Sequence, residues 1–166
     1  MDILRKIFAK EKSKFAQNND FNTWLQNNSH WLPGYALFST LRDKHKTADY
    51  SLWPELNHPS QEQLTTLTSS QSPYYDSVLF YFYIQYQLHL QLQDAANYAA
   101  SHKVGIKGDI AIGVSPKGVE TWIAPHLFRL DKSTGAPPDA FCMHFIDKKS
   151  TDFYSCGWTK LGISYL

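Results

Sequence analysis

Apolar residues recur at helical spacing in three stretches of the first 42 residues, and polar residues separate these stretches. Residues 3–17 predict an amphipathic helix with Lys and Glu on its polar face. The apolar face of this helix comprises Leu4, Ile7, Phe8 and Phe15. Residues 18–20 break the pattern, and Asp20 can cap a short second helix. Residues 29–42 begin with a cap residue, Ser29, and predict a third helix.

A longer helix is expected after an irregular segment. Residues 43–74 are polar and contain three prolines, with a short helix start at Ser60. From Asp76 to about His102 the pattern is helical again. One strongly apolar face consists of Leu79, Phe82, Tyr83, Tyr86 and Leu90. The other face also carries apolar residues, namely Tyr81, Leu88 and Leu92. This distribution predicts a helix packed between other elements.

The pattern changes after residue 103. Residues 104–114 combine β-branched residues with glycine and predict a buried strand of a parallel sheet. Residues 119–125 predict a short helical turn, and the two prolines in 135–139 predict a rigid loop. A helix followed by a buried strand and a loop is typical of α/β barrels.

Composition limits the functional classes. Sixteen Lys and Arg against 15 Asp and Glu leave no basic excess, so nucleic-acid binding is not expected. Apolar runs are too short for a membrane span, and the N-terminus lacks an apolar signal core, so a cytoplasmic protein is expected. The two cysteines, Cys142 and Cys156, have no metal-site spacing, and neither a metal nor a cofactor is predicted.

Three segments together resemble the 4-α-glucanotransferase family (amylomaltases, or disproportionating enzymes). Residues 30–38 read His-Trp-Leu-Pro-Gly-Tyr-Ala-Leu-Phe, similar to the family's H-W-L-x-x-Y-A-L-F helix. Residues 80–92 are the aromatic part of the long helix. The third segment joins Lys-Gly-Asp-Ile-Ala-Ile-Gly at 107–113 to Gly-Ala-Pro-Pro-Asp-Ala-Phe at 135–141. Order and spacing agree, so the resemblance covers residues 3–141.

The resemblance implies an α/β fold: a mainly helical fragment of a (β/α)8 TIM-type barrel with its helical insertion subdomain. The insertion would occupy about 1–102, and a barrel strand with substrate loops about 103–141. The implied partner is a maltodextrin or another α-1,4-glucan, a segment of which is transferred with retention to an acceptor glucan or glucose. Such chemistry requires a nucleophilic carboxylate and an acid/base carboxyl about 5–5.5 Å apart. In the family both follow the Gly-Ala-Pro-Pro-Asp loop, so we expect no catalytic residue in this chain.

Asp109 matches the aspartate of the family's G-D-x-P-I motif, which helps to hold substrate. A carboxylate among Ile and Val is costly to bury unless it is paired, which favours a functional role over a structural turn. Ala111 stands in place of the motif's proline.

Pro138, Asp139 and Phe141 belong to the loop that, in the family, lies beside the donor and acceptor glucan. Phe141 offers a face for sugar stacking, and an ordinary surface turn is the alternative. We expect Asp109 and Asp139 to share one groove. Tyr35 could stack on a glucan at a secondary surface site, although its helix-face neighbours favour a core position.

Other aromatic and imidazole side chains carry weaker indications. Packing roles are expected for three tryptophans, Trp31, Trp53 and Trp122. No spacing typical of metal ligands or of a catalytic triad links the histidines, including His30, His89 and His126.

Residues 142–166 do not continue the family pattern, which runs on to Gly-Gln-x-Trp-Gly-x-Pro-x-Tyr. The stretch 158–166 can be encoded by TGG ACA AAA TTG GGG ATT TCC TAC CTA. Moved by one nucleotide, this string reads Gly-Gln-Asn-Trp-Gly-Phe-Pro-Thr and the start of Tyr. We therefore expect a frameshift near residues 142–157, with a divergent natural end as the alternative.

The sequence thus favours a piece of a 4-α-glucanotransferase that is inactive alone. A non-catalytic maltodextrin-binding or interaction fragment is the second hypothesis, and a translation product without a role is the third.

Overall fold

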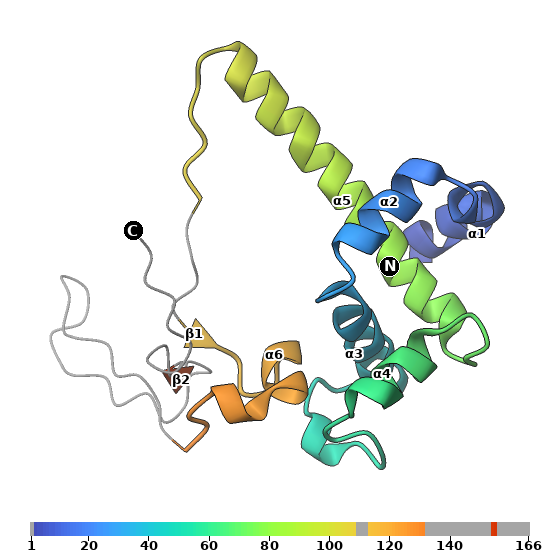
Figure 1. Ribbon diagram of the computed structural model, residues 1–166, viewed down its shortest axis with the longest axis vertical. Coiled ribbons are helices and arrows are strands. Elements are labelled where there is room, and N and C mark those ends of the chain that lie inside the picture. The colour runs from blue at the N-terminus through green and yellow to red at the C-terminus, as the bar shows by residue number, and fades with distance from the viewer. Residues whose placement is uncertain (1, 109–112, 132–153, 156–166) are drawn as a thin grey trace, which may run out of the picture. The chain divides into compact units, whose positions relative to one another are not determined.

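The structure, a computed structural model, describes residues 2–108, 113–131 and 154–155 (Figure 1). The chain divides into two compact units that interleave along the sequence. The first combines Met1–Thr47 with Ser60–Gly108, and the second combines Ala48–Pro59 with Asp109–Leu166. No helix among the described residues has both the length and the apolar content needed to cross a bilayer.

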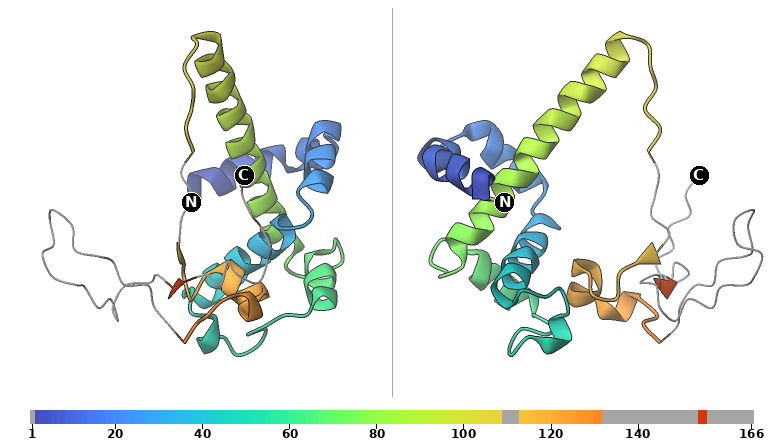
Figure 2. Two further views of the ribbon diagram at one scale, coloured as in Figure 1. Left: turned by 60° about the vertical axis from the view of Figure 1, so that its left-hand side comes forward. Right: turned by 180° about the vertical axis from the view of Figure 1, so that it is seen from behind.

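The regular elements of the first unit's described part are all helices, and the sequence predicts a helix in each of these regions. Its elements are α1 (Asp2–Ala16), α2 (Asn19–Asn27), α3 (Leu32–His45), α4 (Gln61–Thr68) and α5 (Tyr75–Ser101). The other four helices surround one end of α5, and α3 makes the most extensive packing against it (Figures 1 and 2).

Helix starts follow local side-chain chemistry. Asn18, and not the predicted Asp20, caps α2, because its side-chain oxygen accepts a hydrogen bond from the Phe21 backbone N–H at 3.0 Å. Ser60 opens α4 in a capping box with Gln63, in which each side chain bonds the other's backbone N–H. The predicted cap at Ser29 is wrong, since α3 begins three residues later with a proline in its first turn.

Aromatic rings fill the core of the first unit. Phe8 packs against Phe80 and Tyr83, with ring centroids 5.5 and 5.3 Å apart. Phe15 lies 3.8 Å from Phe21 and 5.1 Å from Tyr83. Three of these pairs are tilted and the Phe15–Tyr83 pair is edge-on. Favourably oriented aromatic pairs contribute about 0.5–1.5 kcal/mol beyond the burial of their area.

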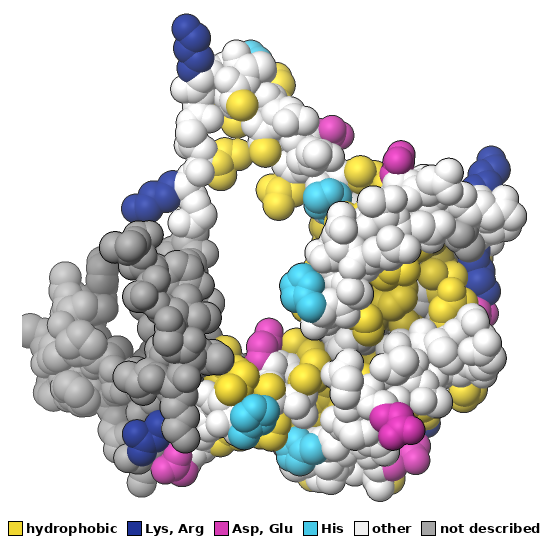
Figure 3. All heavy atoms as spheres, viewed as in Figure 1, with side chains coloured by type: hydrophobic (Ala, Val, Ile, Leu, Met, Phe, Trp, Pro, Cys, Tyr) yellow, Lys and Arg dark blue, Asp and Glu magenta, His cyan; other side chains and the backbone are white. Residues whose placement is uncertain are grey.

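The long helix α5 is packed along only part of its length. Its buried residues lie between Val78 and Tyr86. Beyond them Leu88 is 51% exposed and Leu92 67% exposed, and apolar side chains reach the surface along this distal half (Figure 3). The prediction of a helix packed between other elements is therefore right for the first half of α5 and wrong for the second.

The second unit contains short elements. They are the 3-10 helix η1 (Tyr50–Leu52), β1 (Gly113–Val114), α6 (Val119–Ile123), the 3-10 helix η2 (Pro125–Leu127) and β2 (Tyr154–Ser155). The two strands pair antiparallel, with Gly113 opposite Ser155. The predicted buried strand over 104–114 is wrong at its start, because residues 104–108 form no strand and Ile106 is 62% exposed.

Two tryptophans hold the second unit together, which confirms the packing roles predicted for both. Trp122 is fully buried, lies 5.8 Å from Trp53 between ring centroids, and donates its indole N–H to the Leu56 carbonyl at 2.7 Å. The Tyr50 hydroxyl donates to the Pro116 carbonyl at 3.1 Å. These contacts fasten the segment 48–59 to the chain around α6.

Candidate functional site

Four of the predicted site residues, Asp109, Pro138, Asp139 and Phe141, lie outside the described residues, and so does the groove expected around them. Their roles therefore stay predictions. Tyr35 is described. Among the residues that the structure describes, no three His, Cys, Asp or Glu side chains come together as a metal site.

Tyr35 is half-buried on α3 and lies between two other rings. Its ring centroid is 6.1 Å from that of Trp31 and 6.3 Å from that of Tyr81, the latter in an edge-on arrangement. The packing on Tyr81 fits the core alternative, and the remaining exposure leaves part of the ring accessible to a ligand. Trp31 is 37% exposed, so it is a surface residue and not part of the core.

Asp43 interacts with the last ring of the aromatic row formed by Trp31, Tyr35 and Tyr81. Its carboxylate contacts three donors, which come from α1, α3 and α5. The Tyr81 hydroxyl donates a short hydrogen bond to its carboxylate, and Arg5 and Arg42 each form an ion pair with it at 3.2 Å. The Arg5 guanidinium also lies 4.4 Å above the centre of the Phe80 ring. The carboxylate therefore ties three helices together.

These contacts shift the pKa values of the network. Burial favours the neutral carboxyl of Asp43 and by itself would raise the pKa. Hydrogen bonds from Tyr81 and Arg42 and the positive charges of Arg42 and Arg5 outweigh this effect, so the pKa of Asp43 is lowered. Burial and the hydrogen bond to Asp43 raise the pKa of Tyr81 to about 12. The described ion pairs of Asp43 and its hydrogen bond from Tyr81 all join residues of the helical unit, which favours a structural role for the network.

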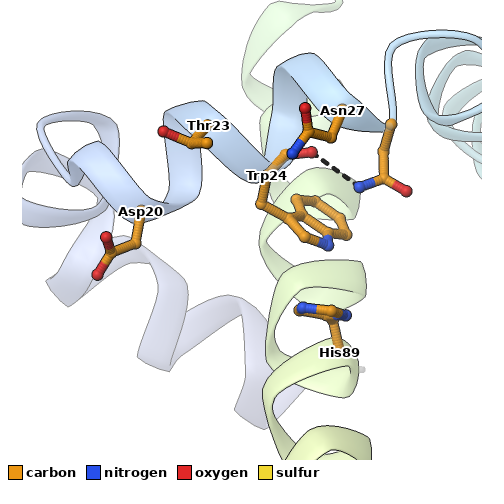
Figure 4. A pocket seen from close by; sticks show the side chains of 6 residues that line it. Asp20, Thr23, Trp24, Asn27 and His89 are labelled. Carbon is orange, nitrogen blue, oxygen red and sulfur yellow. Dashed lines mark hydrogen bonds between the residues drawn. The ribbon is translucent and has the colours of Figure 1, made fainter.

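A second polar-aromatic arrangement lies between α2 and α5 and was missed from the sequence. It is an open pocket of about 480 Å³. Its lining residues are Asp20, Thr23, Trp24, Asn27, Asn28 and His89. The half-buried Trp24 indole lies over the His89 imidazole, with ring centroids 5.7 Å apart and planes inclined by 38° (Figure 4).

Neighbouring side chains fix the position of Trp24 in this pocket. Trp24 packs on Tyr86 of α5, with ring centroids 5.3 Å apart, and on Phe21, with centroids 6.3 Å apart. Asn28 ends α2, donating its amide N–H to the Trp24 carbonyl at 2.8 Å and accepting from the Trp31 indole at 2.9 Å. The indole is thus held in place before any ligand arrives.

The signal for this pocket was present in the sequence. Asp20, Thr23, Trp24 and Asn27 follow the spacing i, i+3, i+4, i+7, which places them on one face of a helix. Helix faces are predicted from the periodicity of apolar residues. A polar face with a single tryptophan is typical of a solvent-exposed surface and does not by itself indicate a pocket. His89 lies on α5, 62 or more residues along the chain from these four residues. Only the tertiary packing of α2 on α5 brings it into the pocket.

The fold resembles the amylomaltase from Streptococcus agalactiae, solved in complex with acarbose, with a TM-score of 0.73 and 20% identity. That similarity covers 96% of this chain and 33% of the amylomaltase chain.

Sequence comparison then gives the family. The sequence model described as 4-alpha-glucanotransferase matches residues 1–144, and the chain belongs to this family. It is 45% identical over 141 residues to the 4-alpha-glucanotransferase DPE2 of Oryza sativa subsp. japonica, covering 85% of this chain and 15% of that protein. It is 31% identical over 140 residues to a 4-alpha-glucanotransferase of Chlamydia pneumoniae, covering 84% and 26%. The matched part of the chain thus spans only 15% and 26% of the length of these two relatives.

Proposed function

We propose that this chain is the helical insertion and the adjoining barrel segment of a 4-α-glucanotransferase. The complete protein would transfer a segment of an α-1,4-glucan to an acceptor glucan or glucose with retention. The family match over residues 1–144, with 45% identity to the rice enzyme, carries this proposal. The binding of acarbose, a saccharide, by the similar amylomaltase supports a glucan as the partner.

The resemblance also supports specific roles in the substrate region. Asp109 would hold the donor sugar, and Pro138, Asp139 and Phe141 would form a rigid loop beside it. Retaining transfer requires a nucleophile and an acid/base carboxyl in one cleft. The resemblance assigns both groups to sequence beyond the Gly-Ala-Pro-Pro-Asp loop, so we propose that the 166-residue polypeptide alone does not catalyse transfer.

Residues 142–166 are proposed to be read in a shifted frame. The family match ends at residue 144, which supports this proposal. Sequencing the DNA over these codons and downstream tests it: the alternative frame should open on Gly-Gln-Asn-Trp-Gly-Phe-Pro-Thr. A downstream frame without any family sequence would contradict the proposal.

Activity is tested on maltotriose, with released glucose as the readout. The 166-residue chain should release none, and the protein expressed from a frame-restored gene should release glucose and form longer glucans. Inactivity of the restored protein would contradict the proposed transferase. Glucose release by the 166-residue chain, abolished by Asp109→Asn, would make Asp109 catalytic.

A non-catalytic maltodextrin-binding fragment is a second candidate. It is favoured by the first unit, whose described helices enclose an aromatic core of their own. Maltodextrin binding without turnover would support this candidate.

A further inference from the structure

The pocket between α2 and α5 presents polar side chains that the fold does not use. Among the described contacts, Asp20, Asn27 and His89 form no hydrogen bond or ion pair within the protein. The Thr23 hydroxyl donates to the Asn19 carbonyl at 3.0 Å, which leaves its oxygen lone pairs able to accept. An oriented aromatic pair is therefore flanked by free acceptors and donors.

We propose that this pocket, built on Trp24 and His89, is a binding site for an α-1,4-glucan. A pyranose ring has an apolar C–H face and a rim of hydroxyl groups. The Trp24 indole, which packs on Tyr86 and Phe21, offers an aromatic surface for the C–H face. The hydroxyl groups both donate and accept, which matches the amide of Asn27 and the carboxylate of Asp20.

Charge and size narrow the class of ligand. Among the described residues that line the pocket, Asp20 is the only Asp, Glu, Lys or Arg, so an anionic ligand such as a sugar phosphate would meet a negative charge and no Lys or Arg to pair with. About 480 Å³ lies within the range of small-molecule pockets, and its open side lets a chain of sugars continue past it. The choice of the α-1,4 linkage rests on the proposed function.

The test uses the full 166-residue chain with 15N-labelled tryptophan side chains. The sequence has five tryptophans, and Trp24→Phe identifies the indole N–H resonance of Trp24 by its disappearance. Titration with maltoheptaose should shift this resonance with saturation, at a dissociation constant on the order of 1 mM. Because the readout is local, it is independent of transferase activity, and failure of either proposal can be told from failure of the other.

Two variants on one helix separate the site from general effects. Asn27→Ala removes an exposed amide with no partner in the fold and should weaken binding by about fivefold, as one neutral hydrogen bond predicts. Gln26→Ala, the exposed neighbour outside the pocket lining, is the matched control and should leave the affinity unchanged.

Three results would overturn the proposal. One is a Trp24 resonance that does not move at about 20 mM maltoheptaose, well above the expected dissociation constant. Another is an affinity that Asn27→Ala leaves equal to that of Gln26→Ala. Equal binding of cellohexaose, the β-1,4-linked counterpart, would overturn the assignment to α-1,4-glucans.

Discussion

The substitution Tyr81→Phe tests how strongly the Asp43 network joins the helices of the first unit. The phenol ring is 2% exposed and stays in place, so the change removes only the hydroxyl that donates to Asp43. A hydrogen bond to a charged group contributes about 1.5–3 kcal/mol. Asp43 keeps Arg5 and Arg42, and its side chain is 37% exposed, so water can replace the lost donor. We therefore expect the lower end, a loss of about 1.5 kcal/mol.

Urea unfolding followed by circular dichroism measures this loss. With a slope of about 1–3 kcal/mol per molar urea, the midpoint should fall by roughly 0.5–1.5 M. The combination of Tyr81→Phe with Asp43→Ala should show a coupling energy of about 1 kcal/mol, because each change removes the same hydrogen bond.

Tyr35→Phe is the matched control. It also removes a tyrosine hydroxyl from the same aromatic row, but that hydroxyl bonds to no described residue, so its effect should stay within about 0.5 kcal/mol. If Tyr81→Phe had no larger effect than Tyr35→Phe, or if the two network substitutions were additive, the network would not stabilise the unit.

Two further predictions concern alkaline stability and the second unit. Burial and carboxylate partners raise the pKa of both Tyr81 and Tyr83 to about 12, from 10.0. Between these pKa values the native state keeps phenol protons that the unfolded chain loses. The urea midpoint should therefore stay constant below pH 10 and fall between pH 10 and 12. A variant with both tyrosines changed to Phe should lose most of this pH dependence. Trp122→Phe should cost the second unit about 3 kcal/mol, because it opens a cavity and leaves the part-buried Leu56 carbonyl without its donor. Limited proteolysis should then cleave the segment 48–59 faster than in the unchanged protein. The control is Trp31→Phe, at an exposed tryptophan. If both variants were cleaved at the same rate, burial of Trp122 would not protect the segment.

Helices were predictable from the sequence because their determinants are local. The long helix was expected from Asp76 to about His102 and runs from Tyr75 to Ser101. The start at Ser60 was also predicted, and its capping box needs only residues three apart. Residues 104–108 carry the β-branched and glycine pattern of a strand, but a strand also needs a partner, which periodicity cannot supply.

The same distinction holds for the sites. Asp109 and the 135–141 loop were found through a family resemblance, since isolated residues give no geometry. Asp20 was interpreted as a helix cap, although Asn18 performs that role and leaves the Asp20 carboxylate free in a pocket. His89 was dismissed for lack of ligand spacing, because only the packing of α2 against α5 brings it into the same pocket lining as Asp20.

The interleaving of the two units has a consequence for the order of events during synthesis. Residues 48–59 leave the ribosome long before residues 113–127, to which Trp53, Leu56 and Tyr50 bind. Until α6 has been made, this segment is a loop between α3 and α4 without its aromatic partner. Domains generally fold as their chain emerges, so the helical unit can form first and the Trp122 contact closes the second unit later. A ribosome that pauses before Trp122 would therefore hold a folded helical unit with an open loop in which Trp53 lacks its partner ring, a natural target for chaperones.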